Sequence, residues 1–271
     1  MSTETIARRD DRPAVGTLHG AHAPSCAAPV LDAEPNAVGR RLAAIVGPGH
    51  PVRAFTTGVA LSFVSIAAVS ILLGLLVTRV IVRAGGIDSA DESLVGFLSH
   101  HRSVGLTDAS LIGSILAGGV VLPIIVGVCG VVAALFKQWR LAAFLIFALA
   151  VESGAYRATT LVVHRDRPQV HRLEDLPVNA SYPSGHTAAS IAVYGGLALL
   201  LTSRISRLAP RVLIWAVAAA IPVYVAFARM YRGMHHPLDV AGGVVIGIAA
   251  LMAMVLVSRV ARLAAAERDG S

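Results

Sequence analysis

The stretch from Pro183 to Val257 decides the fold, and it reads PSGHTAASIAVYGGLALLLTSRISRLAPRVLIWAVAAAIPVYVAFARMYRGMHHPLDVAGGVVIGIAALMAMVLV. Three apolar runs follow one another in it, at Thr187–Thr202, Val212–Ala228 and Val240–Val257. Each is close to the length of about 20 residues that a helix needs to cross a bilayer. A basic turn separates the first two runs, and a segment rich in arginine and histidine separates the last two. The sequence therefore predicts three membrane-spanning helices joined by short polar connections.

The chain as a whole has the composition of an integral membrane protein. Of its 271 residues, 55% are hydrophobic and 14% are charged, and the mean hydropathy is +0.71. Soluble domains usually carry about 25% charged residues. Three further apolar runs precede the opening stretch, at Val59–Val77, at Ala109–Phe136 and from Leu141 onward. The segment Asp88–Asp108 mixes apolar and charged residues, as is typical of a helix that lies in the membrane interface.

We therefore expect an all-α polytopic membrane protein: a six-transmembrane-helix bundle with a short interfacial helix between spans one and two. Pro123 lies within the second run, and transmembrane helices tolerate an internal proline. Glu152 and Arg157 lie on poorly matched faces of the third run, so we expect their partners elsewhere. Gly243 and Gly247 in the sixth run have the spacing of a tight contact between helices.

The two ends of the chain differ from the bundle. Residues 1–52 are rich in proline and show no sustained apolar period, which predicts a disordered cytoplasmic tail. No apolar segment follows the early arginines, so this tail does not have the pattern of a signal peptide. We assign residues 53–258 to the six-span domain and residues 259–271 to a cytoplasmic C-terminal tail.

The basic residues indicate which face of the bundle is cytoplasmic. Six spans place both tails and the turns after spans two and four on one face, which carries fourteen lysines and arginines, while the other carries eight. The cytoplasmic face has the excess, so we expect the polar segments 167–186 and 229–239 together on the non-cytoplasmic face. The net charge of +7 follows this topology, and we expect no nucleic-acid partner. Cys26 and Cys129 are poorly placed to form a disulfide.

Both polar segments carry groups suited to binding an anion. Arg167 and Arg229 present fixed-charge forks that match phosphate oxygens. Ser184 and Gly185 lie where a loop turns into a helix, and backbone N–H groups at a helix start hold anions. Glycine at this point also lets the backbone approach a ligand closely.

The same segments carry groups suited to proton transfer and nucleophilic attack. His186 and His235 are side chains of the type that can titrate near neutral pH. Asp239 follows His235 by four residues, so we expect it to accept a ring N–H and orient the imidazole, as in a catalytic triad. We predict no metal ligand set and no cofactor, because no cluster of acidic, cysteine or histidine residues has ligand spacing. The arginines would then stabilise the charge of the transition state.

This pattern resembles the type-2 phosphatidic acid phosphatase superfamily, also called lipid phosphate phosphatases. Its signatures are Lys-x6-Arg-Pro, Pro-Ser-Gly-His and Ser-Arg-x5-His-x3-Asp. The second signature is intact at residues 183–186, and the resemblance covers roughly residues 55–257. The third matches at Arg229, His235 and Asp239, but Ala228 replaces the serine. The first matches at Arg167-Pro168, but Thr160 stands where the lysine belongs.

The resemblance implies a membrane enzyme that hydrolyses a lipid phosphate or diphosphate, such as a phosphatidate-like lipid or a polyprenyl diphosphate, without a metal. It implies that His235 attacks phosphorus to form a phosphohistidine, and that Asp239 orients His235. It implies that His186 protonates the leaving oxygen and then activates water. The residues that bind the phosphate would be Arg167, Arg229, Ser184 and Gly185. Membrane lipids would be the further partners.

Two other functions fit parts of the pattern. The replacements at Thr160 and Ala228 are compatible with a non-catalytic protein of the same fold that binds or transports an anion. A haloperoxidase using vanadate in the same pocket is disfavoured, because we expect such enzymes to be soluble. For several other histidines we favour solvated or structural roles over metal binding: His100, His101, His164, His171 and His236. Residues 88–102 and 169–182 are expected to shape the headgroup site.

Overall fold

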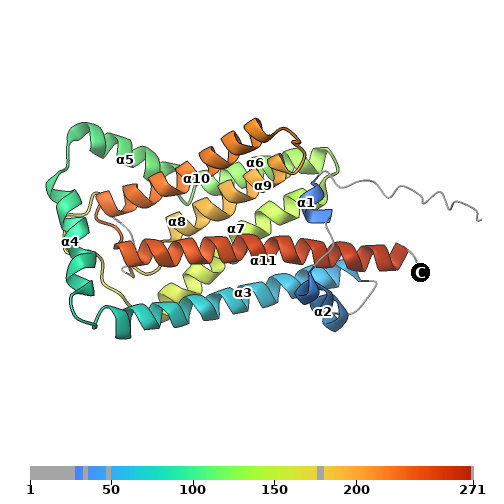
Figure 1. Cartoon of the computed structure of the whole chain (residues 1–271), viewed down its shortest axis with the longest axis horizontal. Helices are drawn as coiled ribbons and strands as arrows, with labels where there is room; N and C mark the ends of the chain where they lie inside the picture. Colours follow the sequence, from blue (N-terminus) through green and yellow to red (C-terminus); the bar gives the residue numbers. More distant parts are fainter. Residues whose placement is uncertain (1–27, 33–35, 47–49, 176–179, 270–271) are drawn as a thin grey trace, which may run out of the picture.

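The computed structural model describes residues 28–32, 36–46, 50–175 and 180–269, and every regular element in these ranges is a helix (Figure 1). The all-α class is therefore confirmed for this part of the chain. The helices have the following bounds: α1 Pro29–Asp32, α2 Ala37–Val46, α3 Pro51–Leu76, η1 Val77–Ile81, α4 Ile87–His100, α5 Val104–Leu116, α6 Val121–Leu135, α7 Trp139–Val162, α8 Gly185–Ser190, η2 Ile191–Gly195, α9 Gly196–Thr202, α10 Leu208–Tyr231 and α11 Pro237–Asp269.

Five helical segments of the described chain are long and apolar enough to cross a membrane. They are α3 with η1, α7, the continuous run from α8 to α9, α10, and α11. The pair α5 and α6 makes a sixth span if the two are counted together. The long helices run side by side along the molecule, and α4 lies across one end of them (Figure 1). The polytopic membrane bundle with a helix between its first two spans is thus confirmed.

The second apolar run is not the continuous helix that the sequence predicted. It breaks at residues 117–120, and α5 and α6 meet at an angle of 43°. Gly118 and Gly119 lie at the break, where glycine is a poor helix former. Pro123 lies in the first turn of α6, where the N–H that proline lacks would have no partner within the helix. The run is apolar as predicted, but its break at residues 117–120 was not predicted.

Part of the N-terminal segment is ordered, in contrast to the predicted disorder through residue 52. Residues 29–32 and 37–46 form α1 and α2, and Leu31 is fully buried in the main core. Arg140 of α7 donates to Asp32 at 2.7 Å and to the carbonyl of Leu31 at 2.9 Å. Ala28 and Leu31 are buried in the main core, and Ala43 is buried in a second cluster with Ala54, Val260 and Ala264, so a few small apolar contacts and the bonds of Arg140 fix this segment. Residues 1–27, including Cys26, lie outside the described ranges.

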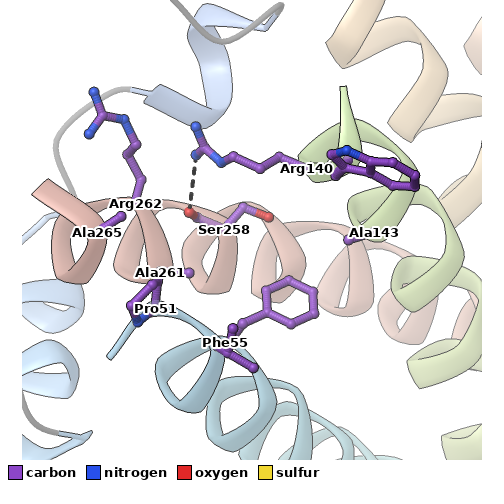
Figure 2. A pocket seen from close by; sticks show the side chains of 10 residues that line it. Pro51, Phe55, Arg140, Ala143, Ser258, Ala261, Arg262 and Ala265 are labelled. Atoms are coloured by element: carbon purple, nitrogen blue, oxygen red, sulfur yellow. Dashed lines mark hydrogen bonds between the residues drawn. The ribbon is translucent and has the colours of Figure 1, made fainter. Parts of the chain in front are cut away.

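The bundle continues past its predicted limits at both ends, because α3 begins at Pro51 and α11 extends to Asp269. Near these helix ends, α3, α7 and α11 enclose a small pocket lined by Phe55, Ala143 and Ala261 (Figure 2). Arg140 crosses this region and lies 3.4 Å from the carbonyl of Ser258. The start of α3 and the C-terminal part of α11, which line the pocket, lie at the end of the bundle away from α4 (Figure 1).

Two glycines bring α11 against α8 and position the site. A Cβ on Gly243 would lie 2.5 Å from the carbonyl oxygen of Ser184, and one on Gly247 would lie 2.6 Å from that of Ala188. Contacts this short allow no side chain, so both positions require glycine. The tight helix contact that their spacing predicted is confirmed, and it holds the start of α8 against the start of α11.

Candidate active site

The two polar segments of the sequence meet at the end of the bundle that α4 covers (Figure 1). Arg229 lies in the last turn of α10, His235 in the loop that follows, and His186 in the first turn of α8. His235 interacts electrostatically with Arg229, Arg167 and His186, and His186 interacts with both arginines. The fold therefore brings four of the predicted site residues together from positions up to 68 residues apart, since 235 − 167 = 68.

His235 is held by the backbone of the other polar segment. Its side chain is buried, and its Nδ1 lies 2.7 Å from the carbonyl oxygen of Ser181. A carbonyl oxygen only accepts hydrogen bonds, so Nδ1 carries the proton and Nε2 keeps its lone pair. Burial and the neighbouring Arg229 lower the pKa of His235 well below its usual 6.5. His235 is thus neutral at physiological pH with Nε2 available as a nucleophile.

Asp239 does not make the contact that the sequence predicted for it. Its Oδ2 lies 3.9 Å from Nδ1 of His235, beyond hydrogen-bonding distance. Asp239 instead accepts bonds from the hydroxyl of Ser181, the guanidinium of Arg165 and the backbone N–H of His236. Its link to His235 runs through Ser181, whose carbonyl accepts from the histidine and whose hydroxyl donates to the carboxylate.

Arg229 presents an open edge inside the protein. Its side chain is fully buried, and its Nη1 donates to Ser114 at 2.9 Å and to Glu174 at 2.7 Å. Nε and Nη2 have no hydrogen-bond partner among the described residues. These two nitrogens form the side-on edge of the guanidinium, which binds carboxylate or phosphate with two parallel bonds. Buried donors without partners are rare in proteins, so this edge marks a place for an anion.

Glu174 supplies the negative charge that balances this end of α10. It pairs with Arg229 and with Nε of Arg232. Arg232 is fixed further by Ser110 at 3.0 Å and by the carbonyl of Leu173 at 3.1 Å. Burial alone would raise the pKa of Glu174, but the two arginines outweigh it and lower the pKa to about 2. Glu174 is therefore charged, and it orients Arg229 without covering its side-on edge.

Arg167 and Ser184 have structural contacts of their own. Arg167 donates to the carbonyls of Met234 and Ala180, so it joins the loop of His235 to the segment before α8. The backbone N–H of Ser184 donates to the carbonyl of Asp239 at 2.9 Å, and its hydroxyl pairs with the hydroxyl of Thr187 at 2.9 Å. These contacts place both residues beside the histidines.

Residues 141–262, which carry these groups, match the model of the PAP2 superfamily. This segment belongs to the PAP2 superfamily. A 75-residue piece of the chain is 41% identical to an undecaprenyl-diphosphatase of Sulfolobus acidocaldarius, covering 28% of this chain and 32% of that protein. The match thus spans about a third of the length of this relative.

The fold agrees with that of a solved PAP2 structure. A transmembrane PAP2-type phosphatidylglycerolphosphate phosphatase from Bacillus subtilis superposes with a TM-score of 0.61. The superposition covers 71% of this chain and 94% of that chain, at 21% sequence identity. At this identity the likeness shows the fold alone, and the site of the present chain is described from its own residues.

The two departures from the PAP2 signatures have structural counterparts. Thr160 is buried on α7, and its hydroxyl donates to the carbonyl of Arg157 at 2.9 Å, so it supplies no charge to the site. Ala228 is fully buried against Gly113 of α5, where an added Cβ would lie 2.7 Å from that of Ala228. Position 228 is therefore a close contact between α10 and α5 in this PAP2 segment.

Sequence reasoning missed Tyr156, which lies four residues before Thr160 and on the same face of α7. A Cβ on Gly185 would lie 3.0 Å from the Tyr156 ring, so the ring packs on the backbone of Gly185 and a side chain there would push it aside. Tyr156 also interacts electrostatically with Arg167 and Arg229. The sequence did carry one indication of this residue: Tyr156 lies four residues before Thr160, the position at which the family signature has a lysine.

The interfacial helix α4 takes part in the site through two carboxylates. Asp91 pairs with Arg165 and accepts from the backbone N–H of Leu238 at 3.0 Å. Glu92 lies 2.9 Å from Nε2 of His236. Burial opposes the charging of His236, but its hydrogen bond to Asp239 prevails and raises its pKa. The predicted structural role of His236 agrees with these contacts.

The other histidines singled out from the sequence, apart from His236, have exposed side chains. His100 and His101 are exposed, and each ring nitrogen lies 2.8 Å from a carbonyl of its own helix. His164 and His171 are exposed as well. Glu152 is buried in the bundle and bonded to its neighbour Ser153 at 3.0 Å, instead of to a distant partner. No group of three or more potential metal ligands is found in the described ranges.

Proposed function

We propose that this chain is an integral membrane phosphatase that hydrolyses a lipid phosphate or diphosphate through a phosphohistidine intermediate. One observation carries the proposal: the neutral His235, with its Nδ1 proton held by Ser181, interacts electrostatically with the buried Arg229, whose Nε and Nη2 have no hydrogen-bond partner among the described residues. A nucleophile next to an anion site is what phosphoryl transfer requires. The PAP2 match and the phosphatase names of its relatives support the same conclusion.

In the first step, Nε2 of His235 attacks phosphorus and the bond from phosphorus to the leaving oxygen breaks. Arg229, with Arg167 beside it, binds the phosphoryl oxygens and stabilises their charge without a metal. His186 gives a proton to the leaving oxygen. The negative charge of a bound phosphate favours the protonated form of a nearby imidazole, which supports this role for His186.

In the second step, His186 takes a proton from water, and the water oxygen attacks phosphorus. The bond between phosphorus and Nε2 then breaks, which releases phosphate and restores neutral His235. Asp239 acts through Ser181 and Arg165 in this scheme, and Ser184 and Gly185 shape the phosphate pocket. The sum of both steps is the hydrolysis of one phosphate or diphosphate bond.

We also propose that the site faces away from the cytoplasm and takes its substrate from the bilayer. The site lies at the end of the bundle opposite α1, α2 and the C-terminal end of α11 (Figure 1). The larger number of arginines and lysines at the terminal end favours a cytoplasmic location for that end. A substrate with its headgroup at the opposite membrane surface would place its phosphate among Arg167, Arg229 and the histidines.

The test is an assay of purified full-length protein on phosphatidate and on polyprenyl diphosphate in the presence of EDTA. We expect phosphate release by the wild type, and none by His235→Ala. The matched control is His171→Ala, an exposed histidine of the same surface, which should retain activity. Unchanged hydrolysis by His235→Ala would overturn the mechanism. Tight vanadate binding without turnover of either lipid would instead favour the anion-binding alternative.

A further inference from the structure

A long apolar groove runs along the outside of the bundle between α8 with η2, α10 and α11. It has a volume of about 590 Å³. Its walls are stripes that repeat at helical spacing, from Thr187 to Gly195, from Met230 to Trp215 and from Val240 to Leu251. Residues at such spacing lie on one face of each helix. The three stripes therefore line one continuous channel parallel to the helix axes.

The groove forms where α8 and α11 touch closely and the middle of α10 faces them with small side chains. The glycine contacts of α11 leave no room between α8 and α11. On α10 the lining between the larger Trp215 and Phe227 includes Ala218, Ala219, Pro222 and Ala226, which leave space between the helices. The side of the groove stays open, because Val223 is 69% exposed.

One end of the groove adjoins the candidate active site on all three walls. Thr187 follows His186, Met230 follows Arg229, and Val240 follows Asp239. Thr187 also bonds to Ser184 at 2.9 Å. A molecule lying in the groove would therefore have its end next to the open edge of Arg229.

The length of the groove indicates the size of its occupant. The lining of α10 runs from Trp215 to Met230, which is about 22 Å at the helical rise of 1.5 Å per residue, whereas the walls on α8 with η2 and on α11 run about 12 Å and about 16 Å. All three walls therefore line the groove together over less than half of the roughly 30 Å hydrocarbon core of a bilayer. The apolar walls suit a hydrocarbon chain that extends along the membrane normal.

We propose that this groove binds the hydrocarbon chain of the substrate and presents its phosphate to His235, an inference that rests on the proposed function. A hydrocarbon chain in the bilayer is already in an apolar medium, so the hydrophobic effect contributes little to its binding in the groove. Its contribution is packing and orientation, which hold the phosphate at the attacking nitrogen. Chains too short to reach the walls lose that orientation.

The test fills the groove and compares long-chain with water-soluble substrates. Ala219→Phe on α10 and Val244→Phe on α11 place a ring in the groove, whereas Ala220→Phe and Val245→Phe change the next residue, which is exposed and does not line it. We expect the two groove variants to lower kcat/KM on long-chain lipid phosphate about tenfold, because a displaced chain no longer orients the phosphate, and to leave dihexanoyl phosphatidate within about twofold. Both control variants should match the wild type on both substrates.

A second measurement uses the wild type alone. In mixed micelles at a fixed mole fraction, kcat/KM should rise with chain length, and separate acyl and prenyl series show which chain the groove takes. A kcat/KM that does not depend on chain length in either series, or groove variants that lose activity equally on soluble and long-chain substrates, would overturn the inference. Hydrolysis of no phosphate ester by the wild type would instead overturn the proposed function itself.

Discussion

Nδ1 of His235 lies 2.7 Å from the carbonyl oxygen of Ser181, while the nearest oxygen of Asp239 is 3.9 Å away. The tautomer of the candidate nucleophile is thus set by a backbone group that no substitution removes. Asp239 acts on the position of that group through the Ser181 hydroxyl. The carboxylate is a positioning residue in this arrangement, one step removed from the imidazole.

Replacing Ser181 tests this indirect link. Ser181→Ala leaves the carbonyl in place but removes a bond to the buried carboxylate, and hydrogen bonds to charged groups contribute about 1.5–3 kcal/mol. We expect kcat to fall on the order of tenfold and KM to change little, because the phosphate-binding arginines are untouched. Ser190→Ala, which removes another buried hydroxyl, is the control. Equal effects of the two variants on kcat would show that Ser181 has only a structural role.

Arg229 is expected to be irreplaceable by lysine. Its open Nε and Nη2 edge offers two parallel bonds, whereas an ammonium group offers a point charge. We expect Arg229→Lys to lower kcat/KM by about a hundredfold or more, similar to the loss of one donor to a developing charge. Weaker inhibition by vanadate should accompany this loss. Arg211→Lys at the exposed start of the same helix is the control, and a similar loss there would contradict the assignment.

Because folding lowers the pKa of Glu174, we expect the stability of the protein to depend on pH. The folded-state pKa of about 2 lies below the ordinary value of 4.5, so Glu174 stabilises the fold above pH 4.5. This contribution is lost as the pH falls from 4.5 towards 2. Glu174→Gln should therefore lower the thermal midpoint at pH 7, and its difference from the wild type should shrink below pH 4.5. Asp175→Asn, an exposed neighbour, should show neither effect, and a constant difference for Glu174→Gln across this range would refute the prediction.

The ion pair between Asp91 and Arg165 joins α4 to the site, and both side chains are buried. Breaking a buried pair by neutralising one partner costs about 3 kcal/mol. We expect Asp91→Asn to lower the thermal midpoint and kcat together, because Arg165 also holds Asp239. The control is Asp88→Asn on the exposed face of the same helix. Full activity of Asp91→Asn would mean that α4 is dispensable for the geometry of the site.

The sequence could predict the groups that carry side-chain chemistry, because motif spacing and alternating spans bring Arg229, His235 and His186 to one end. It could not predict the carbonyl of Ser181, since every residue has one. Ser114 meets Arg229 through the packing of α5 against α10, and Glu174 reaches it from the connection between α7 and α8. Hydropathy also does not register a break such as the one at residues 117–120, because glycine and valine are both apolar.

Tyr156 is the described group best placed to serve where the family signature has a lysine. It lies one turn before Thr160 on α7, its ring packs on Gly185, and it interacts electrostatically with Arg167 and Arg229. We expect Tyr156→Phe to raise KM by about tenfold through loss of a hydrogen bond to phosphate. Introducing Thr160→Lys into that variant should restore KM, because a lysine there reaches the same anion.

The control for Tyr156 is Tyr224→Phe. The Tyr224 hydroxyl donates to the carbonyl of Ala109 between α10 and α5, so its loss should lower the thermal midpoint and leave KM unchanged. If Tyr156→Phe lowers the thermal midpoint but keeps the wild-type KM, the hydroxyl does not contact the phosphate. The ring then serves only to pack against Gly185. Rescue by Thr160→Lys separates these outcomes, since added charge restores binding of an anion and does not restore the packing of a ring.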